Sequence, residues 1–100
     1  FPITNQKLNG HNFVQWSQSV LMYIFGRRKD EYLTDVVPVS IKMDPHYHTW
    51  KIENHMVMLW LINSMTMKIG EKFLLYKTTK GIWDATREIY SSSENTSKLF

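Results

Sequence analysis

A run of seven consecutive apolar residues, Met56 to Ile62, constrains the fold of this chain more than any other feature. Upstream of it, Asp44-Pro45 favours the start of a helix, because aspartate accepts free amide protons and proline tolerates the first helical position. We expect this helix to continue to about Ser64. Apolar side chains on all sides of a helix indicate that it is buried on all sides. The run therefore predicts a central helix that the other helices of a compact bundle surround.

The residues from Asn12 to Gly26 predict an amphipathic helix. Asn12 is followed three positions later by Gln15, which matches a capping box, and Gly26 is a common residue at a helix end. Between them, apolar residues recur on one face at 3.6 residues per turn. This face is expected to pack against the central helix.

The remaining segments favour helices over strands. A short helical turn is compatible with Arg27 to Leu33, and helix starts are expected at Thr66, at Thr78 or Thr79, and at Ser91, where Ser91 to Glu94 has the capping-box pattern S-x-x-E. In the helix after Thr79, the residues expected to face inward are Ile82, Trp83, Thr86, Ile89 and Tyr90. The proline within Val36 to Val39 favours an extended connector there.

These patterns predict an all-α fold, a compact bundle of five to six helices in a single domain that spans residues 1–100. The predicted structural core consists of Phe13, Trp16, Val20, Ile24, Trp50, Val57, Trp60, Leu61, Phe73, Trp83 and Tyr90. No cysteine is present, which excludes disulfides and thiolate metal ligands. The apolar run is shorter than the roughly 20 residues that cross a bilayer, so we expect an intracellular protein with no membrane partner. The start at Phe1 and the end at Leu99-Phe100 suggest a piece of a longer polypeptide.

No recognisable catalytic or cofactor site is present in the sequence. We expect His46, His48 and His55 to be surface imidazoles, because no cysteine or suitably placed carboxylate completes a zinc site around them. There is no G-x-S-x-G pattern to hold a nucleophilic serine, and the glycines are too isolated to form a phosphate-binding loop. We therefore expect no enzyme activity, no cofactor, no metal and no small-molecule substrate.

Arg27, Arg28 and Lys29 form a basic cluster in a chain of formal net charge +3. Three cations at the end of a helix are a possible RNA contact, but they also complement the negative end of the helix dipole. The structural role is favoured, because phosphate affinity rises with the number of neutralised charges and three are few.

Val14, Leu21 and Phe25 form a second apolar strip on the flank of the first predicted helix. Two interpretations stay open for it. The strip is either buried between two neighbours within the domain, or it contacts another copy of the chain. We name it as the candidate self-association surface.

The segment from Lys7 to Ser17, KLNGHNFVQWS, resembles the motif K-L-N-G-x-N-[YF]-x-x-W-S in the Gag polyproteins of copia-type LTR retrotransposons, particularly those of plants. Further similarities follow in the same order along the chain, at Trp50, Val57 to Met65, Ile82 to Ala85, Tyr90-Ser91, Asn95 and Leu99-Phe100. One departure is Gly81, where the family usually has a better helix former such as glutamate.

The resemblance implies an all-helical domain like the N-terminal domain of retroviral capsids. Such a domain assembles with copies of itself, within the longer chain, into virus-like particles in the cytoplasm, around the RNA of the element. Because each contact in a shell must be weak, a monomer is compatible with the isolated fragment at modest concentration. It implies that RNA binding resides mainly downstream, where family members carry a zinc knuckle. Two alternatives remain: a nucleic-acid-binding module that uses Arg27 to Lys29, and a host-domesticated Gag-derived adaptor or inhibitor of particle assembly.

Overall fold

The computed structural model describes residues 4, 6–34 and 45–91, and in these residues the fold is all-α, with no β-strand. This confirms the predicted fold class. The predicted connector at Val36 to Val39, the capping residue Asp44 and all but the first residue of the last predicted helix lie outside the described residues. The elements are α1 (Phe13–Gly26), α2 (Glu31–Thr34), α3 (Pro45–Asn63), α4 (Met67–Gly70), the 3-10 turn η1 (Glu71–Phe73), α5 (Thr79–Thr86) and the π-helical turn η2 (Arg87–Ser91).

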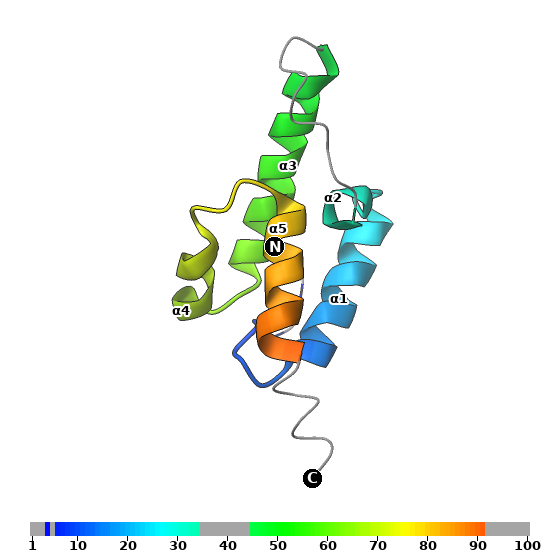
Figure 1. Ribbon diagram of the computed structural model, residues 1–100. Helices are drawn as coiled ribbons and strands as arrows, with labels where there is room; N and C mark the ends of the chain where they lie inside the picture. The colour runs from blue at the N-terminus through cyan, green and yellow to red at the C-terminus, as the bar shows by residue number, and fades with distance from the viewer. Residues whose placement is uncertain (1–3, 5, 35–44, 92–100) are drawn as a thin grey trace.

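The long helix α3 and the shorter α5 form the middle of the bundle, and α1 and α4 lie on opposite sides of them (Figure 1). Helix α5 packs against α3 and α2, and η2 continues from it to pack against α1. The N-terminal end of α3 projects beyond the other helices (Figure 1). The core lies where α1, α3 and α5 meet.

Most of the predicted core is confirmed. The buried members are Phe13, Trp16, Val20, Ile24, Val57, Leu61, Phe73, Trp83 and Tyr90. Trp50 and Trp60 are only half-buried and pack against the edge of this cluster. Trp50 belongs to the half of α3 nearer its projecting end. Trp60 lies at the side of α3, where the ring of Tyr23 meets it edge-on at 5.5 Å between centroids.

The prediction that the central helix is buried on all sides is wrong. Val57 and Leu61 are fully buried, but Leu59 is 57% exposed and Met56 also reaches the surface. The reason is the size of the neighbours, since α2, α4 and α5 are short and cover only part of the circumference of α3. One apolar face of α3 therefore remains uncovered by the described residues.

Ile89 is likewise exposed, although the sequence pattern placed it inward. The pattern assumed 3.6 residues per turn, whereas Arg87–Ser91 forms a π-helical turn with more residues per turn. The wider turn keeps Tyr90 in the core and turns Ile89 towards the surface.

Thr78 caps α5 as expected, because its hydroxyl accepts a hydrogen bond from the Gly81 backbone N–H at 3.0 Å. A Cβ at Gly81 would lie only 3.0 Å from this hydroxyl, so a larger residue there would crowd the cap.

The N-terminal segment around Leu8 packs against the C-terminal end of α3. Leu8 is fully buried, its N–H donates to the Ser64 carbonyl at 2.9 Å, and its own carbonyl accepts from the Thr66 N–H at 3.0 Å. The indole Nε1 of Trp16 donates to the same Ser64 carbonyl at 2.9 Å. These bonds fix the start of α1 and the segment before it against the turn between α3 and α4.

Asn12 occupies the N-cap position of α1, but its side chain makes no capping hydrogen bond. Its Oδ1 instead accepts from the Asn9 N–H at 3.0 Å, and its Nδ2 donates to the Lys7 carbonyl at 3.0 Å. Gly10, between them, has a φ of 97°, which favours glycine. The asparagines and the glycine of the motif therefore shape a tight loop, and the predicted capping box at Asn12 is wrong.

Asn54 is a fully satisfied polar residue inside the core. It is 1% exposed, and its Oδ1 accepts from both the backbone N–H and the hydroxyl of Thr79, each at 2.9 Å. Its Nδ2 donates to the Lys77 carbonyl at 3.0 Å. These bonds fix α3 in register with the start of α5.

Replacement of Asn54 by alanine should therefore destabilise the fold, because it leaves the buried Thr79 N–H without a partner and removes the hydrogen bond to the Lys77 carbonyl. We expect a loss of about 2–4 kcal/mol in the free energy of unfolding, measured by chemical denaturation. The matched control is Asn63→Ala on the same helix, where the side chain is exposed and the change should stay within about 0.5 kcal/mol. Equal losses in the two variants would contradict the role assigned to Asn54.

Arg28 takes the left-handed conformation at the end of α1, with a φ of 60°. The Lys29 N–H donates to the Ile24 carbonyl at 3.0 Å and the Arg28 N–H to the Phe25 carbonyl at 2.9 Å, which is the Schellman pattern of a helix end. Helix α1 does end at Gly26, as expected, but the position that needs a positive φ is two residues later. A side chain at this position costs energy that glycine would not.

The variant Arg28→Gly should be more stable than the wild type by about 0.5–1 kcal/mol, because glycine adopts this conformation without the steric cost. Thermal or chemical denaturation measures the difference. Arg28→Ala is the control, since it removes the charge but keeps the Cβ and should give no gain. A gain in the alanine variant would assign the effect to charge instead of backbone conformation.

Candidate functional site

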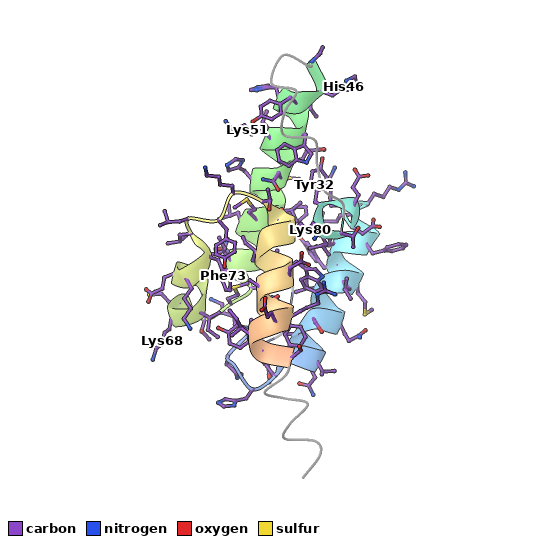
Figure 2. All side chains as sticks on the ribbon, in the orientation of Figure 1. Tyr32, His46, Lys51, Lys68, Phe73 and Lys80 are labelled. Carbon is purple, nitrogen blue, oxygen red and sulfur yellow. The ribbon has the colours of Figure 1, made fainter. Side chains whose placement is uncertain are left out.

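The described residues contain no group of three histidine, cysteine, aspartate or glutamate side chains that could hold a metal ion. His46, His48 and His55 are all exposed on α3, and His46 lies at its projecting end (Figure 2). Within the same residues, no helix is long and apolar enough to cross a membrane. The features that remain to be considered are apolar surfaces and the basic cluster.

The first apolar surface lies on α1. Phe25 is 69% exposed and Leu21 is also at the surface, while Val14 is half-buried. Of the two interpretations of this strip, burial between two neighbours does not fit Phe25. The structure adds Met22, which is 76% exposed and one helical turn from Phe25. We call Leu21, Met22 and Phe25 the α1 surface.

The second apolar surface is a groove where α4 and η1 meet the end of α3. Its volume is about 280 Å³, and it is lined by Lys7, Ile62, Asn63, Met65, Thr66, Met67, Gly70, Glu71 and Leu74. We call it the α4 groove. It is smaller than the roughly 300–1,000 Å³ of pockets that enclose small ligands, and it is open to solvent. Its shape suits a protruding side chain better than an enclosed ligand.

A third apolar surface is the uncovered face of α3. Ile52, Met56 and Leu59 recur at helical spacing on the side opposite the buried Val57 and Leu61. Three separate apolar surfaces on one small domain are typical of a protein that makes contacts with other proteins.

The basic cluster at the end of α1 is largely engaged within the domain. Lys29 forms an ion pair with Glu53 of α3, with 2.6 Å between Nζ and Oε1, and the Tyr32 hydroxyl donates to Oε2 of the same carboxylate at 2.5 Å. The hydrogen bonds from Lys29 and Tyr32 lower the pKa of Glu53 below its ordinary value of 4.5. Burial, together with Glu53, raises the pKa of Tyr32. Glu53 is therefore ionised at neutral pH and neutralises Lys29.

Arg27 is also engaged. Its guanidinium carbon lies 4.4 Å from the centroid of the Tyr23 ring and 5.6 Å from that of Trp60. Such cation–π contacts contribute about 0.5–1 kcal/mol each at exposed sites. The cluster thus joins α1 to α3, which favours its structural role over the possible RNA contact of Arg27, Arg28 and Lys29.

The helical periodicity of the sequence identifies Val14, Leu21 and Phe25 but not Met22, Met67 and Leu74. Met22 falls outside the strip because it lies on the side of α1 opposite the core. Met67 and Leu74 lie in short turns, where too few residues are present for a periodic pattern to show which face is covered. The sequence did contain one signal, the run of consecutive large apolar residues from Phe73 to Tyr76. A single helical turn cannot bury all of them, so some must lie at the surface.

The ion pair predicts a pH dependence of stability. Because the folded pKa of Glu53 is lowered, its contribution is present above about pH 5 and is lost as the pH falls through the folded pKa. The variant Glu53→Gln should be less stable than the wild type by about 0.5–1 kcal/mol at pH 7, measured by urea denaturation across pH. The gap should narrow as the pH falls below 4.5, the ordinary pKa of this carboxyl. Glu88→Gln, at an exposed position, should show no such gap. A gap for Glu53→Gln that stays constant down to pH 3 would contradict the lowered pKa.

Comparison with known proteins did not add a relative. A scan of protein-family models, a search of curated proteins and a search of solved structures each found no match to the chain. The functional interpretation therefore depends on the surfaces described above and on the sequence motifs.

Proposed function

We propose that the chain is a structural, self-associating capsid domain of the Gag type, of the kind that copia-type LTR retrotransposons encode. In this role it forms part of a longer Gag protein that assembles into virus-like particles in the cytoplasm. RNA is packaged chiefly through regions downstream of this domain. The domain carries out no catalysis and needs no cofactor.

The observation that carries the proposal is the exposure of large apolar side chains on a well-packed domain. Phe25, Met67 and Leu75 are mostly exposed, although the core beneath them is closed by residues such as Trp16 and Leu61 that are almost fully buried. Leu21, Met22 and Phe25 lie together on α1, and an exposed apolar patch of this kind marks a contact surface for proteins. The all-α fold and the order of the sequence motifs support the Gag type among contact-making domains.

The alternative of a nucleic-acid-binding module has less support. Lys29 is neutralised by Glu53, and Arg27 is placed over Tyr23 and Trp60. Phosphate binding would have to compete with both contacts. A host-domesticated adaptor of Gag origin would use the same surfaces, so the same experiment examines its ability to self-associate.

Sedimentation velocity of the chain over a concentration series tests the proposal. The average mass should rise with concentration, and Phe25→Asp should weaken the association at least about tenfold, because it places a charge in an apolar contact. Gln15→Asp introduces the same charge at another exposed position of α1 and should leave the association unchanged. A wild-type chain that stays monomeric up to about 1 mM, a concentration at which contacts worth about 4 kcal/mol are populated, would refute self-association.

A further inference from the structure

The loop before α1, drawn in dark blue at the foot of the bundle in Figure 1, contains the pair Asn9-Gly10. Glycine has no Cβ, so no side chain hinders the approach of its nitrogen to the amide carbon of the preceding asparagine. Gly10 has a φ of 97°, and a Cβ built on it would meet no atom within 4 Å. The loop is therefore open at the nitrogen of Gly10.

The side chain of Asn9 is arranged for attack at Cγ and loss of its amide nitrogen. Asn9 is exposed, and its Oδ1 accepts a hydrogen bond from the His11 N–H at 2.8 Å. A donor on this oxygen stabilises the negative charge that the oxygen gains when Cγ is attacked. Among the described residues, neither Nδ2 of Asn9 nor the Gly10 N–H donates a hydrogen bond. The leaving nitrogen and the attacking nitrogen are thus not held by other groups of this part of the chain.

The other described asparagines are Asn12, Asn54 and Asn63, and each is protected in a different way. Asn54 is 1% exposed, and its side chain is bonded at both Oδ1 and Nδ2. Both side-chain atoms of Asn12 are likewise bonded within the loop. Asn63 is exposed, but the Ser64 N–H that follows it donates to carbonyls of the preceding helical turn. Of the described asparagines, Asn9 alone combines an open side chain with an open following nitrogen.

We infer that Asn9 is a site of spontaneous deamidation, with water as the co-reactant. In the first step the Gly10 nitrogen attacks Cγ of Asn9 and gives up its proton. The Cγ–Nδ2 bond breaks, and Nδ2 leaves as ammonia with that proton, so that a cyclic succinimide remains. Two reacting atoms held next to each other in one chain react much faster than separate molecules do. This inference does not depend on the proposed function.

Water then opens the ring in one of two ways. Addition of water at Cγ breaks the new bond to the Gly10 nitrogen and gives aspartate. Addition at the main-chain carbonyl carbon of residue 9 breaks the original peptide bond and gives isoaspartate, in which the main chain runs through Cβ and Cγ. Either product has gained one water, has lost one ammonia and carries a carboxylate in place of the neutral amide of asparagine.

The two products differ in their effect on the loop. Aspartate keeps an oxygen that accepts from the His11 N–H, whereas isoaspartate lengthens the main chain by one methylene, about 1.5 Å. The lengthened segment lies between Leu8, which two backbone hydrogen bonds fix to the end of α3, and Asn12 at the start of α1. The bonds from His11 to Asn9 and from Asn9 to Asn12 both span it. Isoaspartate therefore loosens the contact of Leu8 with α3.

Ageing of the folded chain at mildly alkaline pH tests the site. Mass spectrometry of digested samples should show deamidation at Asn9 at least about tenfold faster than at Asn12 or Asn63, because only Asn9 has both reacting groups open. Conversion at Asn63 as fast as at Asn9 would refute the inference. A synthetic peptide of residues 6–13 gives the rate without the fold. If this peptide converts completely while Asn9 in the chain stays intact, the loop protects the asparagine and the inference is likewise refuted.

The control variant is Asn9→Ser, because serine keeps a short side-chain oxygen for the turn but has no amide to lose. Circular dichroism should show the wild-type fold, since position 9 is exposed. On ageing, ion-exchange chromatography should show that the variant gains negative charge at least about tenfold more slowly than the wild type, because the open pair of reacting groups is gone. Equal rates would place the reactive asparagine elsewhere in the chain and refute the site.

Hydrogen exchange tests the effect of isoaspartate on the fold. The aged chain is separated chromatographically into its aspartate and isoaspartate forms. The Leu8 and Thr66 amides, which donate across the contact, should exchange at least about tenfold faster in the isoaspartate form than in the wild type, because local opening governs their protection. The variant Asn9→Asp, which reproduces the other product, should exchange like the wild type. Equal protection of these two amides in the isoaspartate form and the wild type would refute the loosening of Leu8.

Discussion

The carbonyl of Ser64 is the point on which the arrangement of the helices depends. It accepts two hydrogen bonds at 2.9 Å, one from the Leu8 backbone and one from the Trp16 indole, and both donors belong to buried residues. A buried donor without a partner costs about 1–3 kcal/mol, so neither bond is easily given up. Through this one acceptor, the N-terminal segment and α1 are both fixed to the end of α3. Trp16 then lies 5.8 Å from Trp83 between ring centroids, which brings α5 onto the same core.

The hydrogen bonds at Ser64 also explain why apolar residues remain at the surface. Once α1 and α5 are fixed against the inner side of α3, the described chain has only α4 and η1 left to cover the rest, and together these span Met67 to Phe73. They cover Ile62 and Met65 but not Leu59 or Met56. The domain therefore has a well-buried core but leaves three apolar surfaces exposed. A Gag-type function would give those surfaces partners.

Much of this fold could be predicted from the sequence, because helix periodicity and end signals are local. The limits of α1, the end of α3 near Ser64 and the cap at Thr78 follow from such signals, and so does most of the core. What could not be predicted depends on neighbours. Burial of Leu59 depends on whether another element reaches it, and the role of Asn12 depends on Asn9 and Lys7, which offered its side chain better partners than the helix end did. The same distinction applies to the candidate site. The strip on α1 follows a helical period and could be predicted, whereas the α4 groove is formed by short turns that show no period.

The basic cluster links this architecture to the proposed contact. Helix α1 is held to α3 at its first turns by Trp16, and at its last turn by Arg27 beside Trp60, with the Lys29–Glu53 ion pair just beyond. Attachment at both ends prevents α1 from rotating about its own axis, so Phe25 and Met22 are directed outward before any partner binds. A contact surface that is already rigid loses less conformational entropy on binding, and this matters most for a small interface. The cations that first suggested RNA binding therefore hold the helix that carries the α1 surface, and in the proposed self-association their role would be indirect.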